Sequence, residues 1–108
     1  MIAPEAVLTV LRRMHDPSGQ SPFMTALPVA GVDGSLAGRM KGTAAEGNVR
    51  AKTGTMSNVR SLAGYVNTRD GERLAFVIIA NNFEGSGAEA TAALDTMAVR
   101  LASFSRNP

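Results

Sequence analysis

The apolar residues near both ends of the chain recur at the spacing of an α-helix. Near the N-terminus, Pro4 and Glu5 suit the first turn of a helix, and Asp16-Pro17-Ser18-Gly19 interrupts the pattern that follows them. Near the C-terminus, one apolar stripe consists of Leu94, Met97, Leu101 and Phe104. We therefore predict one helix that begins at Pro4 and a second helix over residues 88–104.

The middle of the chain carries the alternating pattern of β-strands instead. Strands are predicted over residues 49–53, 59–68 and 73–80, and Asp70-Gly71 marks a hairpin between the last two. Because residues 73–80 are apolar at nearly every position, we expect that strand in the centre of the sheet with cover on both faces. Residues 20–48 predict an irregular connection with one short helix near residues 36–40.

This order of elements predicts a single α+β domain over residues 1–108. Its antiparallel sheet should have at least three strands, with the N-terminal and the C-terminal helix packed on one face. The opposite face would then be apolar and uncovered, which usually marks an interface. We therefore expect the chain to associate with another copy of itself as a homodimer, or with a complementing N-terminal fragment.

Composition excludes several classes of function. A net charge of +2 with no Trp argues against nucleic-acid binding. There is no cysteine, and the single histidine, His15, has no carboxylates clustered around it in the sequence, so we expect neither a metal site nor a cofactor. The first residues lack the basic and apolar regions of a signal peptide, and the longest apolar run, residues 74–80, is too short to span a membrane.

The strongest chemical signal is Lys52-Thr53-Gly54-Thr55, at the end of the first predicted strand. A lysine on a strand is a point charge that can hold an anion, and two threonine hydroxyls can donate hydrogen bonds to a carboxylate. The glycine removes a side chain that would keep a ligand away from the backbone, and a strand edge offers N–H groups to an oxyanion. The combination suits binding of a carboxylate beside a reactive carbonyl, although a solvated strand end would look the same.

The residues around this motif resemble one family, in one order along nearly the whole chain. The blocks that carry the resemblance are residues 27–36 (LPVAGVDGSL), 39–43 (RMKGT), 49–56 (VRAKTGTM), 62–66 (LAGYV) and 74–76 (LAF). They are similar to the penicillin-binding, serine-type D-alanyl-D-alanine carboxypeptidase/endopeptidase family, which is related to the serine β-lactamases. The Lys-Thr-Gly element is a known motif of that superfamily.

The resemblance implies a partial penicillin-binding transpeptidase-like fold and hydrolysis of D-Ala-D-Ala bonds or cross-links in peptidoglycan, outside the cytoplasm. Such enzymes acylate a serine in a Ser-x-x-Lys motif, assisted by a Ser-x-Asn motif. By match, Lys52 would act electrostatically on the Ser-x-Asn serine and the substrate carboxylate. Thr53 and Thr55 would contact that carboxylate, the Thr55 N–H would form half of the oxyanion hole, and Gly54 would complete the wall.

Neither Ser-x-x-Lys nor Ser-x-Asn occurs in this sequence. The chain therefore resembles the C-terminal portion of such an enzyme, and three hypotheses remain open. It could complete an active site with another segment or chain. It could be a small stand-alone hydrolase, with β-lactamase or esterase activity, that uses Lys52 with Ser57 as an improvised nucleophile and Ser61 as the second choice. It could also be a non-catalytic module that binds D-Ala-D-Ala peptides or β-lactams.

The remaining polar side chains are expected to have mainly structural roles. His15 should end the first helix, where a positive charge offsets the helix dipole. Tyr65 is expected to be half buried in the sheet with its hydroxyl reaching water. Arg50 and Arg60 flank the motif strand and should be solvated at its edge, with steering of an anionic substrate as the alternative.

Overall fold

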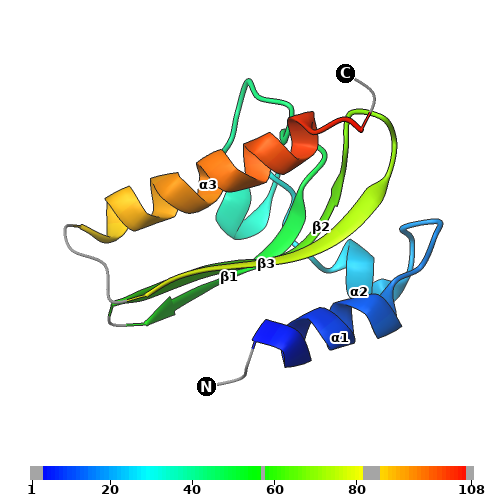
Figure 1. The fold of residues 1–108 in the computed structure, drawn as a ribbon, viewed down its shortest axis with the longest axis horizontal. Helices are drawn as coiled ribbons and strands as arrows, with labels where there is room; N and C mark the ends of the chain where they lie inside the picture. Colours follow the sequence, from blue (N-terminus) through cyan, green and yellow to red (C-terminus); the bar gives the residue numbers. More distant parts are fainter. Residues whose placement is uncertain (1–3, 57, 82–85, 107–108) are drawn as a thin grey trace.

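The computed structural model describes residues 4–56, 58–81 and 86–106 of the 108-residue chain. Two helices, α1 (Pro4–Met14) and the short α2 (Pro22–Thr25), come first, followed by the 3-10 turn η1 (Gly34–Leu36). Three strands follow, β1 (Arg50–Met56), β2 (Val59–Asn67) and β3 (Arg73–Asn81), and helix α3 (Gly87–Ser103) ends the described structure. The prediction of an α+β fold with an N-terminal and a C-terminal helix on an antiparallel sheet is confirmed (Figure 1).

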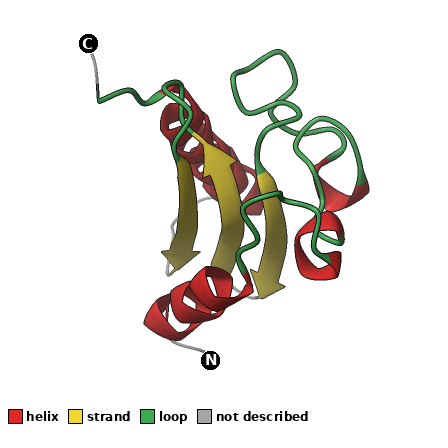
Figure 2. Ribbon diagram, turned by 90° about the vertical axis from the view of Figure 1, so that its right-hand side faces the viewer, coloured by secondary structure: helices red, strands yellow, loops and turns green. Residues whose placement is uncertain are grey.

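The strands form one antiparallel sheet in the order β1-β2-β3. Lys52 lies opposite Ala63, Gly54 lies opposite Ser61, and Val66 lies opposite Leu74. The prediction that residues 73–80 form the central strand is wrong for the described structure, in which β2 is central and β3 lies at an edge (Figure 2). The apolar character of β3 reflects burial of its two faces and says nothing about its two edges.

The two long helices cover opposite faces of the sheet, which corrects the expectation that both pack on one face (Figure 1). Side chains alternate between the faces of a strand, and β2 is apolar on both. Leu62 and Val66 of β2 pack with Leu94 of α3 in the larger core, whereas Tyr65 packs with Leu11 of α1 in a smaller one. The sheet is therefore the middle of three layers, and α1 covers the face that was expected to stay apolar and uncovered.

Several element bounds differ from the predicted ones for local reasons. Strand β1 continues to Met56 because its last residues still pair with β2. The short helix near residues 36–40 is instead the 3-10 turn η1, Gly34–Leu36. Helix α2 was not predicted, although Ser21 caps it by accepting a hydrogen bond from the Met24 N–H and Pro22 follows the cap. A Ser-Pro pair is a recognised start signal for a helix.

The long connection between α2 and β1 packs along the outer edge of β1. The N–H of Ala30 donates to the Val49 carbonyl oxygen, and the N–H of Ala51 donates to the Pro28 carbonyl oxygen. Leu36, Ala45 and Val49 are fully buried. The connection therefore covers the first residues of β1 and leaves the edge open beyond Ala51, where the Lys-Thr-Gly motif begins. None of the described helices has the length and hydrophobicity of a membrane-spanning segment.

Candidate active site

Lys52 lies in β1 with an exposed side chain, so the charged group is available to a ligand. Its Nζ donates a hydrogen bond to the carbonyl oxygen of Thr53 at 2.8 Å. Lys52 lines the same pocket as Val7 of α1 and Ala63 of β2, which places it on the face of the sheet that α1 covers. The lysine is therefore a solvated cation on a strand and is not part of the packed core.

The backbone of β1 presents polar groups at its open edge. The Ala51 N–H points outward, because it donates to Pro28 rather than to β2. In an antiparallel sheet, N–H groups of alternate residues point to the same side of the strand, so those of Thr53 and Thr55 also point outward. The Thr53 carbonyl that accepts from Lys52 lies at this edge too. An ammonium group and two N–H donors thus lie along one short stretch of strand edge.

The two threonine side chains lie on the other face of β1 from Lys52, because side chains alternate along a strand. Thr53 is half buried and its Oγ1 donates to the Ser35 Oγ at 3.3 Å, whereas Thr55 is exposed. Only a ligand at the strand edge could therefore contact Lys52 and the threonines together. Ser35, the middle residue of η1, is a neighbour of the motif that sequence reasoning missed, because it lies 18 positions earlier in the chain.

Gly54 has a packing role as well as the expected one. A Cβ built at Gly54 would lie 2.4 Å from the Oγ of Ser61, its partner on β2. Ser61 therefore faces the neighbouring strand β1, and it lines a groove of about 270 Å³ with Lys52, Gly54 and Ile79. This groove, which we call the motif groove, has mostly apolar walls and runs over the face of the sheet beside α1.

Ser57, the first-choice nucleophile of the stand-alone hypothesis, lies outside the described residues. Its neighbour Asn58 has a positive φ of 57°, as expected for a tight turn between β1 and β2. No group of three or more His, Cys, Asp or Glu residues that could hold a metal ion occurs in the described part of the chain.

The remaining sequence-based expectations concern the opposite end of the same sheet face. His15 is exposed just after α1, and its ring centroid lies 5.8 Å from that of Tyr65. Tyr65 is only 2% exposed and its hydroxyl donates to the Leu11 carbonyl oxygen, so the hydroxyl does not reach water as expected. Burial raises the pKa of this phenol. Arg50 is half buried and donates to the Gly19 carbonyl oxygen at 2.9 Å, so it is not a solvated edge residue.

Residues 1–104 match the model of the D-Ala-D-Ala carboxypeptidase 3 (S13) family. The chain is 44% identical over 109 residues to the D-alanyl-D-alanine carboxypeptidase of Actinomadura sp. (strain R39), an alignment that covers 96% of this chain and 20% of that protein. It is 33% identical to the D-alanyl-D-alanine carboxypeptidase DacB of Haemophilus influenzae, with 99% of this chain and 22% of DacB covered.

The fold is similar to that of a solved protein as well. The crystal structure of penicillin-binding protein 4 (dacB) from Haemophilus influenzae superimposes with a TM-score of 0.79 at 29% identity, covering 95% of this chain and 25% of that one. The same protein has also been solved in complex with a novel β-lactam. The chain thus spans about a fifth of the length of the curated relatives it matches. Sequence and fold agree, and the chain belongs to the D-Ala-D-Ala carboxypeptidase 3 (S13) family.

Proposed function

We propose that this chain forms the substrate-carboxylate and oxyanion wall of a peptidoglycan D-alanyl-D-alanine carboxypeptidase/endopeptidase. The observation that carries the proposal is the open edge of β1, where the Lys52 ammonium lies beside the outward N–H groups of Thr53 and Thr55. The ammonium would attract the terminal carboxylate of the peptide, and the Thr55 N–H would donate to the oxygen that becomes negative during acyl transfer. Gly54 would let the peptide approach the strand closely.

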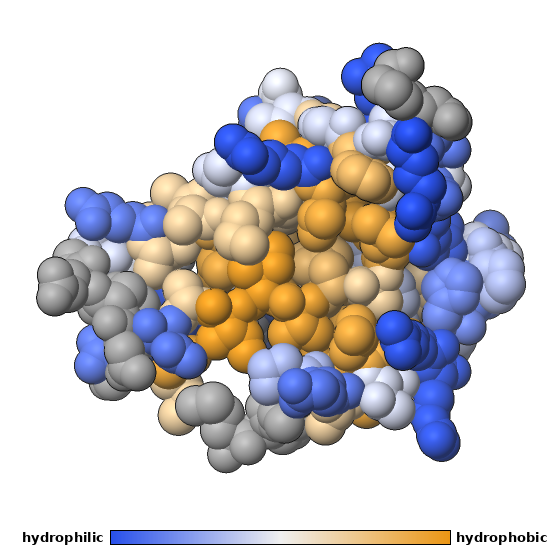
Figure 3. All heavy atoms as spheres, viewed as in Figure 1, coloured by the Kyte–Doolittle hydropathy of each residue, from blue (hydrophilic) through white to orange (hydrophobic). Residues whose placement is uncertain are grey.

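The nucleophile of this reaction would come from outside the described residues. The motif groove presents an apolar surface directly beside Lys52, and β3 has no described strand on its outer edge. Figure 3 shows hydrophobic residues gathered on the face of the molecule where this edge lies. A second segment that brings the Ser-x-x-Lys and Ser-x-Asn motifs could pack on these surfaces. In its absence we expect a second copy of the chain to cover them, and the complete site would act outside the cytoplasm.

The first test measures binding of an acetylated peptide that ends in D-Ala-D-Ala, by calorimetry or by amide chemical shifts. Lys52→Ala should weaken binding about tenfold, since a hydrogen bond to a charged group contributes roughly 1.5–3 kcal/mol and this one is exposed. Lys41→Ala is the matched control, because Lys41 is the other lysine of the chain and is also exposed. Equal effects of the two substitutions would refute the proposed role of Lys52.

A second candidate function, a stand-alone hydrolase, is favoured by one observation. Ser61 lines the motif groove together with Lys52, so a hydroxyl and a cation share one surface. This candidate predicts turnover of a chromogenic β-lactam by the chain alone, which Lys52→Ala and either Ser61→Ala or Ser57→Ala would abolish. Peptide binding without turnover, and without a covalent adduct in the mass spectrum, would leave the wall proposal or a purely binding module. Adding a fragment that carries the two missing motifs separates these two possibilities. Only a chain that forms part of the active site should then gain carboxypeptidase activity, whereas a purely binding module should not.

A further inference from the structure

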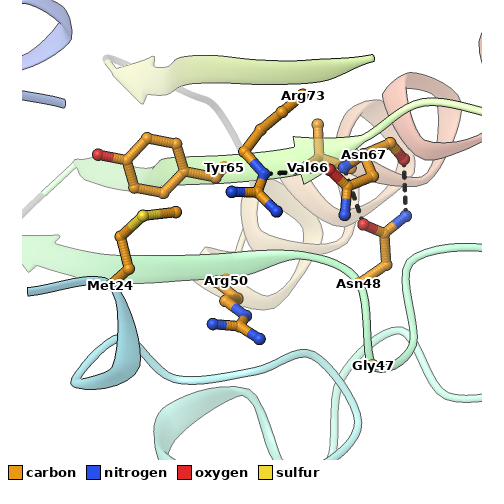
Figure 4. A pocket seen from close by; sticks show the side chains of 8 residues that line it. All are labelled: Met24, Gly47, Asn48, Arg50, Tyr65, Val66, Asn67 and Arg73. Atoms are coloured by element: carbon orange, nitrogen blue, oxygen red, sulfur yellow. Dashed lines mark hydrogen bonds between the residues drawn. The ribbon is translucent and has the colours of Figure 1, made fainter. Parts of the chain in front are cut away.

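Two arginines from different strands line one small pocket at the end of the sheet remote from the β1–β2 turn. Arg50 begins β1 and Arg73 begins β3, and the pocket between them is also lined by Tyr65 and Asn48 (Figure 4). Arg50 lies two residues before Lys52, so the two cations share a face of β1 and lie roughly 7 Å apart along the strand. The pocket is a second polar site and is lined by none of the residues of the Lys-Thr-Gly motif.

Neither arginine is neutralised by a carboxylate in the described structure. The two described ion pairs are Arg39 with Asp95 and Arg106 with Glu72. Arg50 instead donates to the carbonyl oxygen of Gly19, and Arg73 donates to those of Asp16 and Pro17 and to the side-chain oxygen of Asn67. A guanidinium carries five N–H donors. Most donors of Arg50 and the Nη2 group of Arg73 therefore have no acceptor among the described residues.

The surroundings add positive charge to this pocket. A neighbouring pocket shares Tyr65 and Arg73 and is lined in addition by Arg12, near the end of α1. The nearby acid, Asp16, is already engaged, since both of its carboxylate oxygens accept hydrogen bonds from Ser18. These hydrogen bonds hold the pKa of Asp16 below its ordinary value. Asp16 therefore keeps its negative charge, but it forms no ion pair with Arg50 or Arg73 in the described structure.

The walls of the pocket are fixed, and its size limits what can enter. Asn48 is held by a reciprocal pair of hydrogen bonds with the backbone of Asn67, each 2.8 Å long. Met24 and Tyr65 are almost fully buried. The cavity volume of about 60 Å³ is on the order of four water molecules, at roughly 15 Å³ of such volume each. A small ion fits this space, whereas a peptide or a nucleotide base does not.

We propose that this pocket binds a small oxyanion, such as phosphate or a carboxylate, between the guanidinium groups of Arg50 and Arg73. Planar N–H forks match the paired oxygens of these anions, and half-buried guanidinium groups bind them more strongly than exposed ones do. The bound anion would offset the repulsion between the two cations. It would also link the first residues of β1 and β3 to the 16–19 turn, whose carbonyl oxygens both arginines already contact.

The test is an amide chemical-shift titration of the whole chain with inorganic phosphate and, separately, with acetate, against sodium chloride at equal ionic strength. Saturable shifts at Asn48, Tyr65 and Gly19 are expected with an oxyanion and not with chloride. Comparison of phosphate with acetate shows whether a tetrahedral or a planar anion is preferred. Identical shifts in all three salts would overturn the proposal, because the pocket would then respond only to ionic strength.

Variants assign the binding to the two arginines. Arg50→Gln and Arg73→Gln should each raise the dissociation constant at least tenfold, whereas Arg50→Lys, which keeps the charge and loses the fork, should have a smaller effect. Arg100→Gln, at an exposed position of α3 on the opposite face of the sheet, is the matched control and should change the constant less than twofold. If Arg50→Gln fails to fold, the dissociation constant of Arg50→Lys shows whether Arg50 takes part in binding the oxyanion. An unchanged constant in the arginine variants, or an equal loss in Arg100→Gln, would refute the site.

Oxyanion binding between Arg50 and Arg73 does not depend on the proposed enzymatic role of Lys52. Lys52→Ala should leave the phosphate-induced shifts of Asn48, Tyr65 and Gly19 unchanged while it weakens binding of the D-Ala-D-Ala peptide. A chain that binds phosphate normally and ignores the peptide would therefore disprove the proposed function alone.

Discussion

The close packing of β1 on β2 can be tested at Gly64, which lies opposite Ala51 in the central strand. A Cβ added at Gly64 would lie 2.0 Å from the carbonyl oxygen of Arg50, 2.6 Å from the Ala51 Cα and 2.9 Å from its Cβ. The first two of these atoms belong to the backbone, so no side-chain rotation can relieve the contact. Gly64→Ala should therefore push β1 away from β2.

The expected cost lies at the upper end of the range for overpacking, which is about 1–3 kcal/mol. We expect a loss of about 3 kcal/mol in the free energy of unfolding, against a total of roughly 5–15 kcal/mol for a domain of ordinary stability. For a chain of this size, each 1 kcal/mol lowers the melting temperature by roughly 4 °C, so the drop should be about 12 °C.

Urea denaturation followed by circular dichroism measures this loss, with Gly38→Ala as the matched control. A methyl group added at Gly38 would meet no atom within 4 Å, and the φ of Gly38 is not positive, so this substitution should change stability by less than about 0.5 kcal/mol. The displaced β1 also carries Lys52, so Gly64→Ala should weaken peptide binding as well. Equal midpoints for the two glycine variants would refute the described register of β1 on β2.

Three further predictions concern the two cores and the turn between β2 and β3. Leu94→Ala, at a core position only 2% exposed, should destabilise the protein by about 3 kcal/mol in urea, and a loss below about 1 kcal/mol would contradict the packing of α3. Tyr65→Phe removes the hydroxyl that donates to the Leu11 carbonyl oxygen and should lower the free energy of unfolding by about 1 kcal/mol. Because burial raises the pKa of this phenol, the unchanged protein should also lose stability above pH 10, and the variant should lose less. The pKa of Asp70 lies below its ordinary value of 3.8, mainly because the Thr68 hydroxyl donates a hydrogen bond to its carboxylate. The free energy of unfolding should therefore fall as acid protonates Asp70 below that pH. Thr68→Val should make this fall less steep, and an unchanged pH dependence would contradict the role of the Thr68 hydrogen bond.

The sequence by itself determined the kinds of element and the place of the motif. Helical and alternating periodicities are local, and so are the turn residues Asp70-Gly71, so the three strands and the two long helices could be located to within a few residues. The motif Lys52–Thr55 could likewise be placed on a strand, because its flanking residues are strand formers. The family could be named because its blocks follow one another in order along the chain.

The tertiary structure decided everything that depends on which segments meet. The sequence pattern placed α1 on the same face as α3 and β3 in the centre, because apolar periodicity reports burial and does not identify the neighbour. The same limit explains Tyr65, whose hydroxyl finds its acceptor 54 positions away in α1. Arg50 and Arg73 form one pocket only because antiparallel pairing brings the first residues of β1 and β3 to the same end of the sheet. Strand register is a long-range property, and it fixes which charged groups become neighbours.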